Sequence, residues 1–390
     1  MRKLKRKIAS IVPLVYRLAF GYKGSFAQKL KYLHYAKLAK KNGVVDFRID
    51  RLASEYTLDW YSVDNVSKED KEWFCQRGYA PRKINWVGIT KENYRDYISN
   101  FEFYAPKTYV KDSFVEFFEN KLHTYMLLAS FKKNLPTHYW YVENGSCDIY
   151  PLDVECIHNG SYQDIVDLID KKPIVAKACY GGHGKGFMKF EKIGQDKYLI
   201  NNEEVNLHKL IDTIKSLNKY IITDYCYPGK TFAELCGKEA YGVIRVMLVN
   251  DDVDGTQFCA SVIRCGCKSG GLLTDFPGTI YCGLTLDEGV TFDPRMTECI
   301  EPLRSHKITN HPDTGKNMEG VRVPNWADMV KLIKQVAGSM PWIKYIVMDI
   351  IPSDDGFKIL EINSHGQTWV LEPHYPYLKN KYVKKAFNIK

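Results

Sequence analysis

The stretch "YIVMDIIPSDDGFKILEIN", Tyr345 to Asn363, places three oxygen-bearing side chains within two apolar runs. The runs read as β-strands, and Asp354-Asp355-Gly356 predicts a three-residue hairpin loop with glycine in the left-handed position. This loop sets a register in which Asp349 lies directly opposite Glu361. Asn363, two residues further on, shares the face of Glu361 because side chains alternate along a strand.

Two carboxylates that face each other within apolar strands are costly unless a cation or a proton lies between them. Oxygens of Asp, Glu and Asn suit Mg²⁺ or Mn²⁺, which bind through a few carboxylates together with substrate phosphates. We therefore predict that Asp349, Glu361 and Asn363 hold Mg²⁺ or Mn²⁺. The alternative is that the two acids lie at strand ends and face water.

A second informative stretch, "VAKACYGGHGKGFMKF" from Val175 to Phe190, is typical of a phosphate-binding loop. A Walker loop needs a glycine five residues before Gly184-Lys185 and a Ser or Thr after it, but Cys179 and Gly186 stand there. The spacing G-x-G-x-x-G of a dinucleotide-binding turn is also missing. The flanking residues instead predict a strand–loop–strand hairpin.

Other segments give ordinary secondary-structure signals. Ser113 with Glu116 three residues later predicts a helix that continues to about Phe131. The dipeptide Asn144-Gly145 predicts a β-turn between two strands. A mostly β region is expected over 242–289, and the spacing of apolar residues over 326–340 predicts an amphipathic helix.

The first 45 residues form a basic arm, with twelve Lys or Arg and no Asp or Glu. Because the whole chain has a net charge of +9, the remainder is slightly acidic. The apolar part of the arm is shorter than the ~20 residues that span a bilayer, and no signal-peptide cleavage site follows it. The arm is either a packed helix with a solvated basic face or an anchor on an anionic membrane surface. Nucleic-acid binding is not expected, since it needs a basic body as well.

The 11 cysteines are scattered without the spacing of a disulfide framework. This favours a reducing compartment, and we expect a cytoplasmic protein. A zinc site is not expected, because Cys265-Gly-Cys267 has no second cysteine pair to complete four ligands.

Taken in order, these motifs resemble the ATP-grasp superfamily, and more narrowly the sugar-transfer-associated ATP-grasp proteins of bacterial polysaccharide assembly. The likeness runs from about Lys121 to Gln367. It implies an α+β ATP-grasp fold, with the nucleotide between two α+β subdomains and a helical, basic N-terminal extension. We expect four parts: the basic arm 1–45, an N-terminal α/β region 46–170 with the first lysine, the glycine-loop lid 171–235 and a C-terminal subdomain 236–390 with the metal site.

The resemblance also implies roles in an ATP site. Lys121, which follows the polar Asn120, and Lys177 would neutralise phosphate charge, although Ala178 stands where the family usually has proline. Arg245 would lie near the triphosphate, and Arg245 and Lys177 are the expected catalytic residues. The residues expected to bind the nucleotide are Lys121, Lys177, Gly182, His183, Gly184, Lys185, Gly186, Asp224, Tyr225, Cys226 and Glu234.

Several of these roles have simpler alternatives. His183 would be an exposed loop histidine, and Glu234, which we consider for the ribose, would be an exposed acid. Three further residues are candidates for contact with the acceptor substrate, with turn or loop positions as the alternative: Lys268, Asp275 and His365.

The function implied by the resemblance is an ATP-dependent carboxylate–amine ligase that acts through an acyl-phosphate and releases ADP and phosphate. It would join an amino acid or amine to a sugar acid or glycan precursor in capsule or exopolysaccharide biosynthesis. The alternatives are an amino-acid or peptide ligase, a phosphoryl transferase, and a non-catalytic nucleotide-binding partner of a glycan assembly complex. The expected partners are a small-molecule or glycan substrate and, through residues 1–45, the inner face of the membrane.

Overall fold

The computed structural model divides into two compact units. Unit 1 comprises Met1–Thr108, Glu298–Ser305 and Pro376–Lys390, and unit 2 comprises Tyr109–Thr297 and His306–Tyr375. The four ranges predicted from the sequence stay a prediction. The structure describes residues 25–105, 117–152, 159–181, 186–237, 242–267, 278–300, 303–353, 356–363, 366 and 368–389.

Unit 1 is helical and is built on buried aromatic side chains. Ser25 caps α2 through a capping box with Gln28, and Tyr32 and Tyr35 of this helix are each 1% exposed. Residues 26–41 of the predicted basic arm are therefore a packed helix. The helices that the structure describes in unit 1 are α2 (Phe26–Lys41), α3 (Asp46–Ser62), α4 (Lys68–Gln76), α5 (Pro81–Val87), η1 (Tyr94–Asp96), α6 (Asn100–Phe103), η4 (Tyr377–Lys379) and α13 (Lys381–Ala386).

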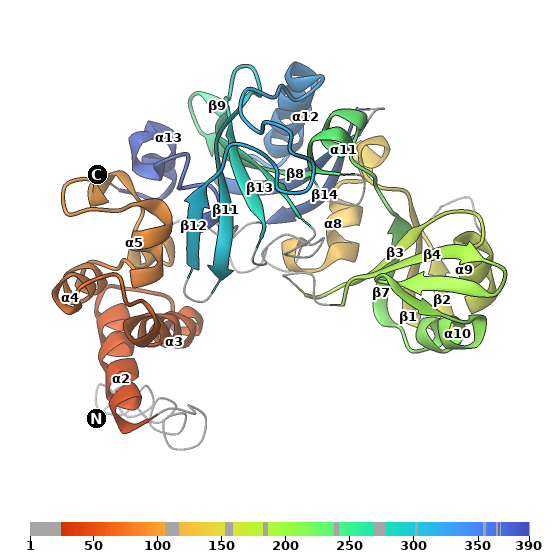
Figure 1. The fold of residues 1–390 in the computed structure, drawn as a ribbon, viewed down its shortest axis with the longest axis horizontal. Helices are drawn as coiled ribbons and strands as arrows, with labels where there is room; N and C mark the ends of the chain where they lie inside the picture. Colours follow the sequence, from red (N-terminus) through yellow and green to blue (C-terminus); the bar gives the residue numbers. More distant parts are fainter. Residues whose placement is uncertain are drawn as a thin grey trace. The chain divides into compact units, whose positions relative to one another are not determined.

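The first sheet of unit 2 has seven strands in the order β2-β1-β7-β3-β4-β5-β6. Two amphipathic helices, α9 (Tyr162–Ile169) and α10 (Leu207–Lys215), bury their apolar faces against it (Figure 1). The strands are β1 (His138–Asn144), β2 (Asp148–Pro151), β3 (Ile174–Ala178), β4 (Met188–Gly194), β5 (Lys197–Ile200), β6 (Glu203–Val205) and β7 (Asn218–Asp224).

Both hairpins predicted in this region are confirmed. Strands β1 and β2 pair antiparallel around the turn after Asn144. The glycine-rich stretch joins β3 to the antiparallel β4, with Ile174 opposite Phe190. The stretch is thus a strand–loop–strand unit and not the strand–loop–helix of a Walker site.

The second sheet also has seven strands, in the order β12-β11-β10-β9-β8-β13-β14. The apolar face of α12 (Trp326–Gly338) packs on it together with α11 (Lys230–Cys236), which confirms the predicted amphipathic helix. The strands are β8 (Gly242–Asp251), β9 (Gly255–Cys265), β10 (Ile280–Leu284), β11 (Thr291–Ile300), β12 (Leu303–Lys307), β13 (Tyr345–Ser353) and β14 (Gly356–Asn363).

The helix predicted from Ser113 to Phe131 is wrong in one respect. Asn120 has extended backbone angles and caps a new helix, α8 (Lys121–Leu127), by accepting a hydrogen bond from the backbone N–H of Leu122. A 3₁₀ segment, η2 (Ala129–Asn134), follows. The predicted start at Ser113 lies outside the described residues. An asparagine oxygen competes well for the free N–H groups of a helix start, so Asn120 ends one helical segment and begins the next.

Across the described residues, no helix has the length and apolar character needed to cross a membrane. One further short element of unit 2, η3 (Thr368–Val370), follows β14 in the chain.

Candidate functional site

The predicted pairing of the two carboxylate positions is confirmed. Asp349 of β13 lies opposite Glu361 of β14, and Val347 lies opposite Asn363. The three predicted metal ligands therefore share one face of the second sheet. The other face carries Ile350, Ile359 and other residues of the apolar core.

The predicted hairpin loop is wrong, although it gave the right register at Asp349. Gly356 already belongs to β14 and pairs with Ser353, at φ +119°. The register shifts by one residue between the turn and the carboxylates, because Leu360 is an extra residue between the Ile350–Ile359 and Asp349–Glu361 pairs. Such a β-bulge lets two residues of one strand oppose one residue of its partner.

Asp349 is held by two arginines. Arg245, its partner on β8, donates from Nε to Oδ1 at 2.8 Å and from Nη2 to Oδ2 at 2.7 Å. Arg264 of β9 brings Nη2 to 3.1 Å from Oδ1. All three side chains are buried, and this parallel arrangement is among the strongest charge-assisted contacts. The sequence prediction named Arg245 but not Arg264.

Two lysines lie at the glycine-rich hairpin, Lys121 on α8 and Lys177 on the hairpin's own strand β3. Lys121, the first residue of α8, donates its backbone N–H to the carbonyl of Cys179 at 2.9 Å. Its Nζ lies 2.8 Å from the carbonyl oxygen of Gly181. Lys177 extends from β3, and burial lowers the pKa of its ammonium, as does the positive charge of Lys121.

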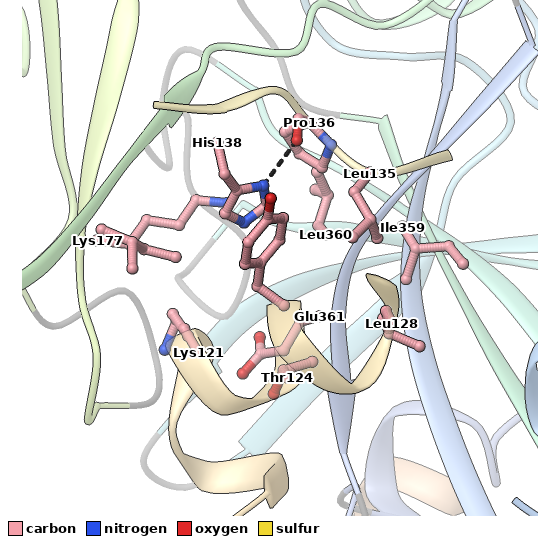
Figure 2. Close-up of a pocket in the computed structure, with 12 residues that line it drawn as sticks. Lys121, Thr124, Leu128, Leu135, Pro136, His138, Lys177, Ile359, Leu360 and Glu361 are labelled. Atoms are coloured by element: carbon pink, nitrogen blue, oxygen red, sulfur yellow. Dashed lines mark hydrogen bonds between the residues drawn. The ribbon is translucent and has the colours of Figure 1, made fainter. Parts of the chain in front are cut away.

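Both lysines and Glu361 line one pocket (Figure 2). The first sheet contributes Lys177 from β3 and His138 from β1, and the second contributes Glu361 from β14. Three consecutive residues of β14, Ile359 to Glu361, contribute to this lining. Its residues are Lys121, Thr124, Tyr125, Leu128, Leu135, Pro136, His138, Lys177, Ile221, Ile359, Leu360 and Glu361.

His138 and Tyr125 are pocket residues that the sequence prediction missed. Their rings stack with centroids 4.2 Å apart, and Nδ1 of His138 lies 2.7 Å from the carbonyl oxygen of Pro136. Burial lowers the pKa of His138 to about 4, so its imidazole is neutral near pH 7 and Nδ1 donates to the carbonyl. No motif in the sequence marks this stacked pair, since the two residues lie on different elements.

The residues predicted to present backbone to adenine begin at the last residue of β7. The carboxylate of Asp224 lies 2.9 Å from Lys172 Nζ and accepts from the hydroxyl of Tyr139 at 2.8 Å. Burial alone would raise the pKa of Asp224, but hydrogen bonds from Thr137, Lys172 and Tyr139 together hold it below its usual value. The Asp224 side chain is thus engaged within its own sheet.

The neighbouring predicted residues have different surroundings. The ring of Tyr225 has Lys189 Nζ 4.4 Å from its centroid. Burial raises the pKa of the Cys226 thiol, and Lys177 opposes that rise. Glu234 on α11 is exposed and lies 3.9 Å from Lys230, one helical turn earlier.

Several predicted residues fall outside the described part of the chain: Gly182, His183, Gly184, Lys185, Lys268, Asp275 and His365. Gly186 is described, at φ +74°, and a Cβ atom there would lie 2.9 Å from the Cβ of Ala178. The roles proposed for all the site residues stay predictions.

The predicted metal ligands are of a suitable chemical type, but arginines compete with a metal for one of them. Two carboxylates and one amide suit Mg²⁺, and among the described residues the side chains of Glu361 and Asn363 form no hydrogen bond or ion pair. Asp349, in contrast, has both oxygens engaged by arginine. Within the described ranges, no group of three or more His, Cys, Asp and Glu side chains forms a metal site.

Curated protein sequences gave no match. Among solved structures, an ADP complex of N5-carboxyaminoimidazole ribonucleotide synthetase is 9% identical, with a TM-score of 0.38, over 70% of this chain and 52% of that one. The biotin carboxylase domain of Hydrogenobacter thermophilus 2-oxoglutarate carboxylase, with MgADP and bicarbonate, is 12% identical, with a TM-score of 0.37, over 70% and 45%. This chain spans about half the length of these two proteins.

D-alanine–D-alanine ligase from Bacillus anthracis is 10% identical, with a TM-score of 0.36, over 73% of this chain and 69% of that one. The family model described as sugar-transfer associated ATP-grasp, in contrast, matches residues 100–373, well over half of the sequence. This match confirms the resemblance and the α+β ATP-grasp fold predicted from the motifs. The chain belongs to the sugar-transfer associated ATP-grasp family.

Proposed function

We propose that the protein is an ATP-dependent carboxylate–amine ligase that acts on a sugar acid or glycan precursor. The observation that carries the proposal is that Lys121, Lys177 and Glu361 line one pocket, with Arg245 one strand beyond Asp349 on the same sheet face. Cations and carboxylates gathered in this way suit a metal–triphosphate complex. The sugar comes from the family description alone.

In the proposed reaction, a carboxylate oxygen of the acceptor attacks the terminal phosphorus of ATP, and ADP leaves. The resulting acyl-phosphate is attacked at its carbonyl carbon by an amine, which loses a proton as phosphate departs. Lys121 and Lys177 would neutralise phosphate oxygens, and Arg245 would stabilise charge on the transferring group. Glu361 and Asn363, together with Asp349, would hold Mg²⁺, which would offset negative charge on the phosphates.

The half-buried position of Lys177 contributes to this role. Charging an ammonium away from water is unfavourable, and burial already lowers the pKa of Lys177. A bound phosphate would supply the missing counter-charge. The unfavourable free energy of keeping Lys177 charged in the free protein would therefore be offset when the nucleotide binds.

The proposal is tested by ADP release in the presence of Mg²⁺ and pools of uronic acids and amino acids. We expect ADP release that requires both an acid and an amine. Glu361→Gln should lower turnover at least about a hundredfold if this residue holds the metal. Glu288→Gln, which alters an exposed carboxylate paired with Arg322, is the matched control and should keep full turnover.

Other results would favour the alternatives. ADP release with an acid or sugar alone, together with a stable phosphorylated product, would identify a phosphoryl transferase. Turnover with amino acids as both acid and amine would identify a peptide ligase. Nucleotide binding without turnover on any pool would favour a non-catalytic partner of a glycan assembly complex. Unchanged turnover in Glu361→Gln would contradict the metal assignment.

A further inference from the structure

We propose that Arg245 and Arg264 prevent Asp349 from binding a cation. This block ends when nucleotide phosphates take over the hydrogen bonds of the two guanidinium groups. Metal binding at Asp349 then depends on nucleotide, and the arginine pair sets the order in which the site fills. This inference deepens the proposed function, and rests on it for the identity of the phosphate ligand.

The geometry leaves little of the Asp349 carboxylate free. Arg245 bonds to both oxygens, at 2.8 and 2.7 Å, and Arg264 approaches Oδ1 at 3.1 Å. The side chains of Arg264, Asp349 and Arg245 are 4%, 7% and 11% exposed. A cation that coordinates Asp349 must therefore replace contacts with guanidinium groups that are already desolvated.

The charges make that replacement unfavourable without an anion. Asp349 and Glu361 face four cations on this sheet face and in the adjoining pocket: Arg245, Arg264, Lys121 and Lys177. A divalent ion added alone would increase an existing excess of positive charge in a buried place. A metal–triphosphate complex has a net negative charge and would balance it.

Phosphate oxygens are the natural competitors for the arginines. Guanidinium binds phosphate through the same parallel pair of hydrogen bonds that it forms with a carboxylate. A triphosphate that takes over Arg245 and Arg264 leaves the Asp349 oxygens free for the metal. Because such coupling is reciprocal, any change that frees the arginines must also favour phosphate binding.

The first experiment measures Mn²⁺ binding without nucleotide. Its readout is the electron paramagnetic resonance signal of free Mn²⁺. We expect the wild-type protein to bind Mn²⁺ with a Kd above about 1 mM. Arg264→Met should bind it at least about tenfold more tightly, because one competing cation has gone. Adding Glu361→Gln to that variant should remove the gain.

Arg295→Met is the matched control. Arg295 lies on β11 of the same sheet and bonds to Asp293 at 2.8 Å. This variant removes a cation of the sheet without opening Asp349, so its Mn²⁺ affinity should equal that of the wild type. Tight Mn²⁺ binding by the wild type, or equal affinities in Arg264→Met and the wild type, would overturn the proposal.

The second measurement keeps both arginines and uses metal-free ADP, with a chelator present. Asp349→Asn should bind ADP at least about fivefold more tightly than the wild type, since the guanidinium groups are released. A residue that acted only as a metal ligand would give no gain. Asp293→Asn is the control, because Asp293 is likewise held by two cations, Arg295 and Lys307. Equal or weaker ADP binding by Asp349→Asn than by the wild type would contradict the proposed block of Asp349 by the two arginines.

The two proposals fail separately. If neither the wild type nor Asp349→Asn binds ADP or ATP, the nucleotide site is wrong, and the Mn²⁺ measurement alone decides whether the arginines exclude cations. If nucleotide binds but Arg264→Met gains no Mn²⁺ affinity, the proposed function still stands, but the proposed block of Asp349 by the arginines is wrong.

Discussion

Arg245 and Asp349 face each other across β8 and β13 and share two parallel hydrogen bonds, of 2.8 and 2.7 Å. Arg264 adds a second guanidinium at 3.1 Å from the same carboxylate. The carboxylate is therefore the common partner of two buried cations.

Removing the common partner should cost more than removing one cation. We expect Asp349→Ala to lower the free energy of unfolding by about 3–5 kcal/mol, because two buried guanidinium groups lose their counter-charge. Arg245→Met should cost less, since Asp349 keeps Arg264. Urea denaturation of both variants measures the difference. A larger loss in Arg245→Met than in Asp349→Ala would show that the carboxylate is not the centre of the cluster.

Lys177→Met should separate stability from binding. Burial lowers the pKa of this lysine, and its ammonium forms no hydrogen bond or ion pair with another residue that the structure describes. Methionine removes the unfavourable buried charge and keeps the apolar stem, so the free energy of unfolding should stay equal or rise. Affinity for ATP should fall at least about tenfold, as measured by calorimetry.

Lys192→Met serves as the control for Lys177→Met. Lys192 lies on β4 of the same sheet and pairs with Asp170 at 2.8 Å. ATP affinity should be unchanged in this variant. Equal ATP affinities in Lys177→Met and the wild type would remove Lys177 from the proposed site.

His374 should make stability depend on pH. Burial lowers its pKa to about 4, whereas an unfolded histidine titrates near about 6.5. Between these values the unfolded chain binds a proton that the folded chain does not, so stability is lost as the pH falls through this window. His374→Asn should shrink the difference in urea midpoint between pH 7 and pH 4.5.

His138 has a similarly lowered pKa, so His374→Asn should leave part of the pH dependence in place. The exposed His208 offers a control. Its replacement by asparagine should leave the pH dependence of the wild type intact. An unchanged pH dependence in His374→Asn would mean that this histidine is protonated alike in both states.

The proposed membrane contact is best tested with a shorter truncation than the whole basic arm. Deleting residues 1–22 spares Ser25 and the packed helix α2, whose loss would disturb unit 1. Each Lys or Arg near an anionic leaflet contributes about 1 kcal/mol. We therefore expect the full chain to float with anionic vesicles and the truncated chain to stay behind.

Neutral vesicles and high salt are the controls for this flotation, and both should abolish binding by the full chain. Equal flotation of the full and truncated chains would place any membrane contact outside the first 22 residues.

The sequence predicted what depends on local pattern. Two apolar runs identified the strands around Asp349 and Glu361, and the glycine-rich hairpin followed from its flanks. Arg264 was missed because its contact with Asp349 depends on how β9, β8 and β13 align, which no local signal encodes. The stacked pair of Tyr125 and His138 was missed for the same reason. Asn120 was predicted to lie within a helix, because its capping role competes with an equally good signal at Ser113.

The bulge at Leu360 has a consequence for recognising distant relatives. Beyond the bulge, each residue of β14 lies opposite a residue of β13. In a hairpin without the bulge, its partner on β13 would be one position away. A relative without the extra residue would still bring an acid opposite the position of Asp349, with one fewer residue between its two carboxylates. A fixed spacing is therefore a poor search pattern for this pair, whereas a spacing that varies by one residue follows from the way the strands meet.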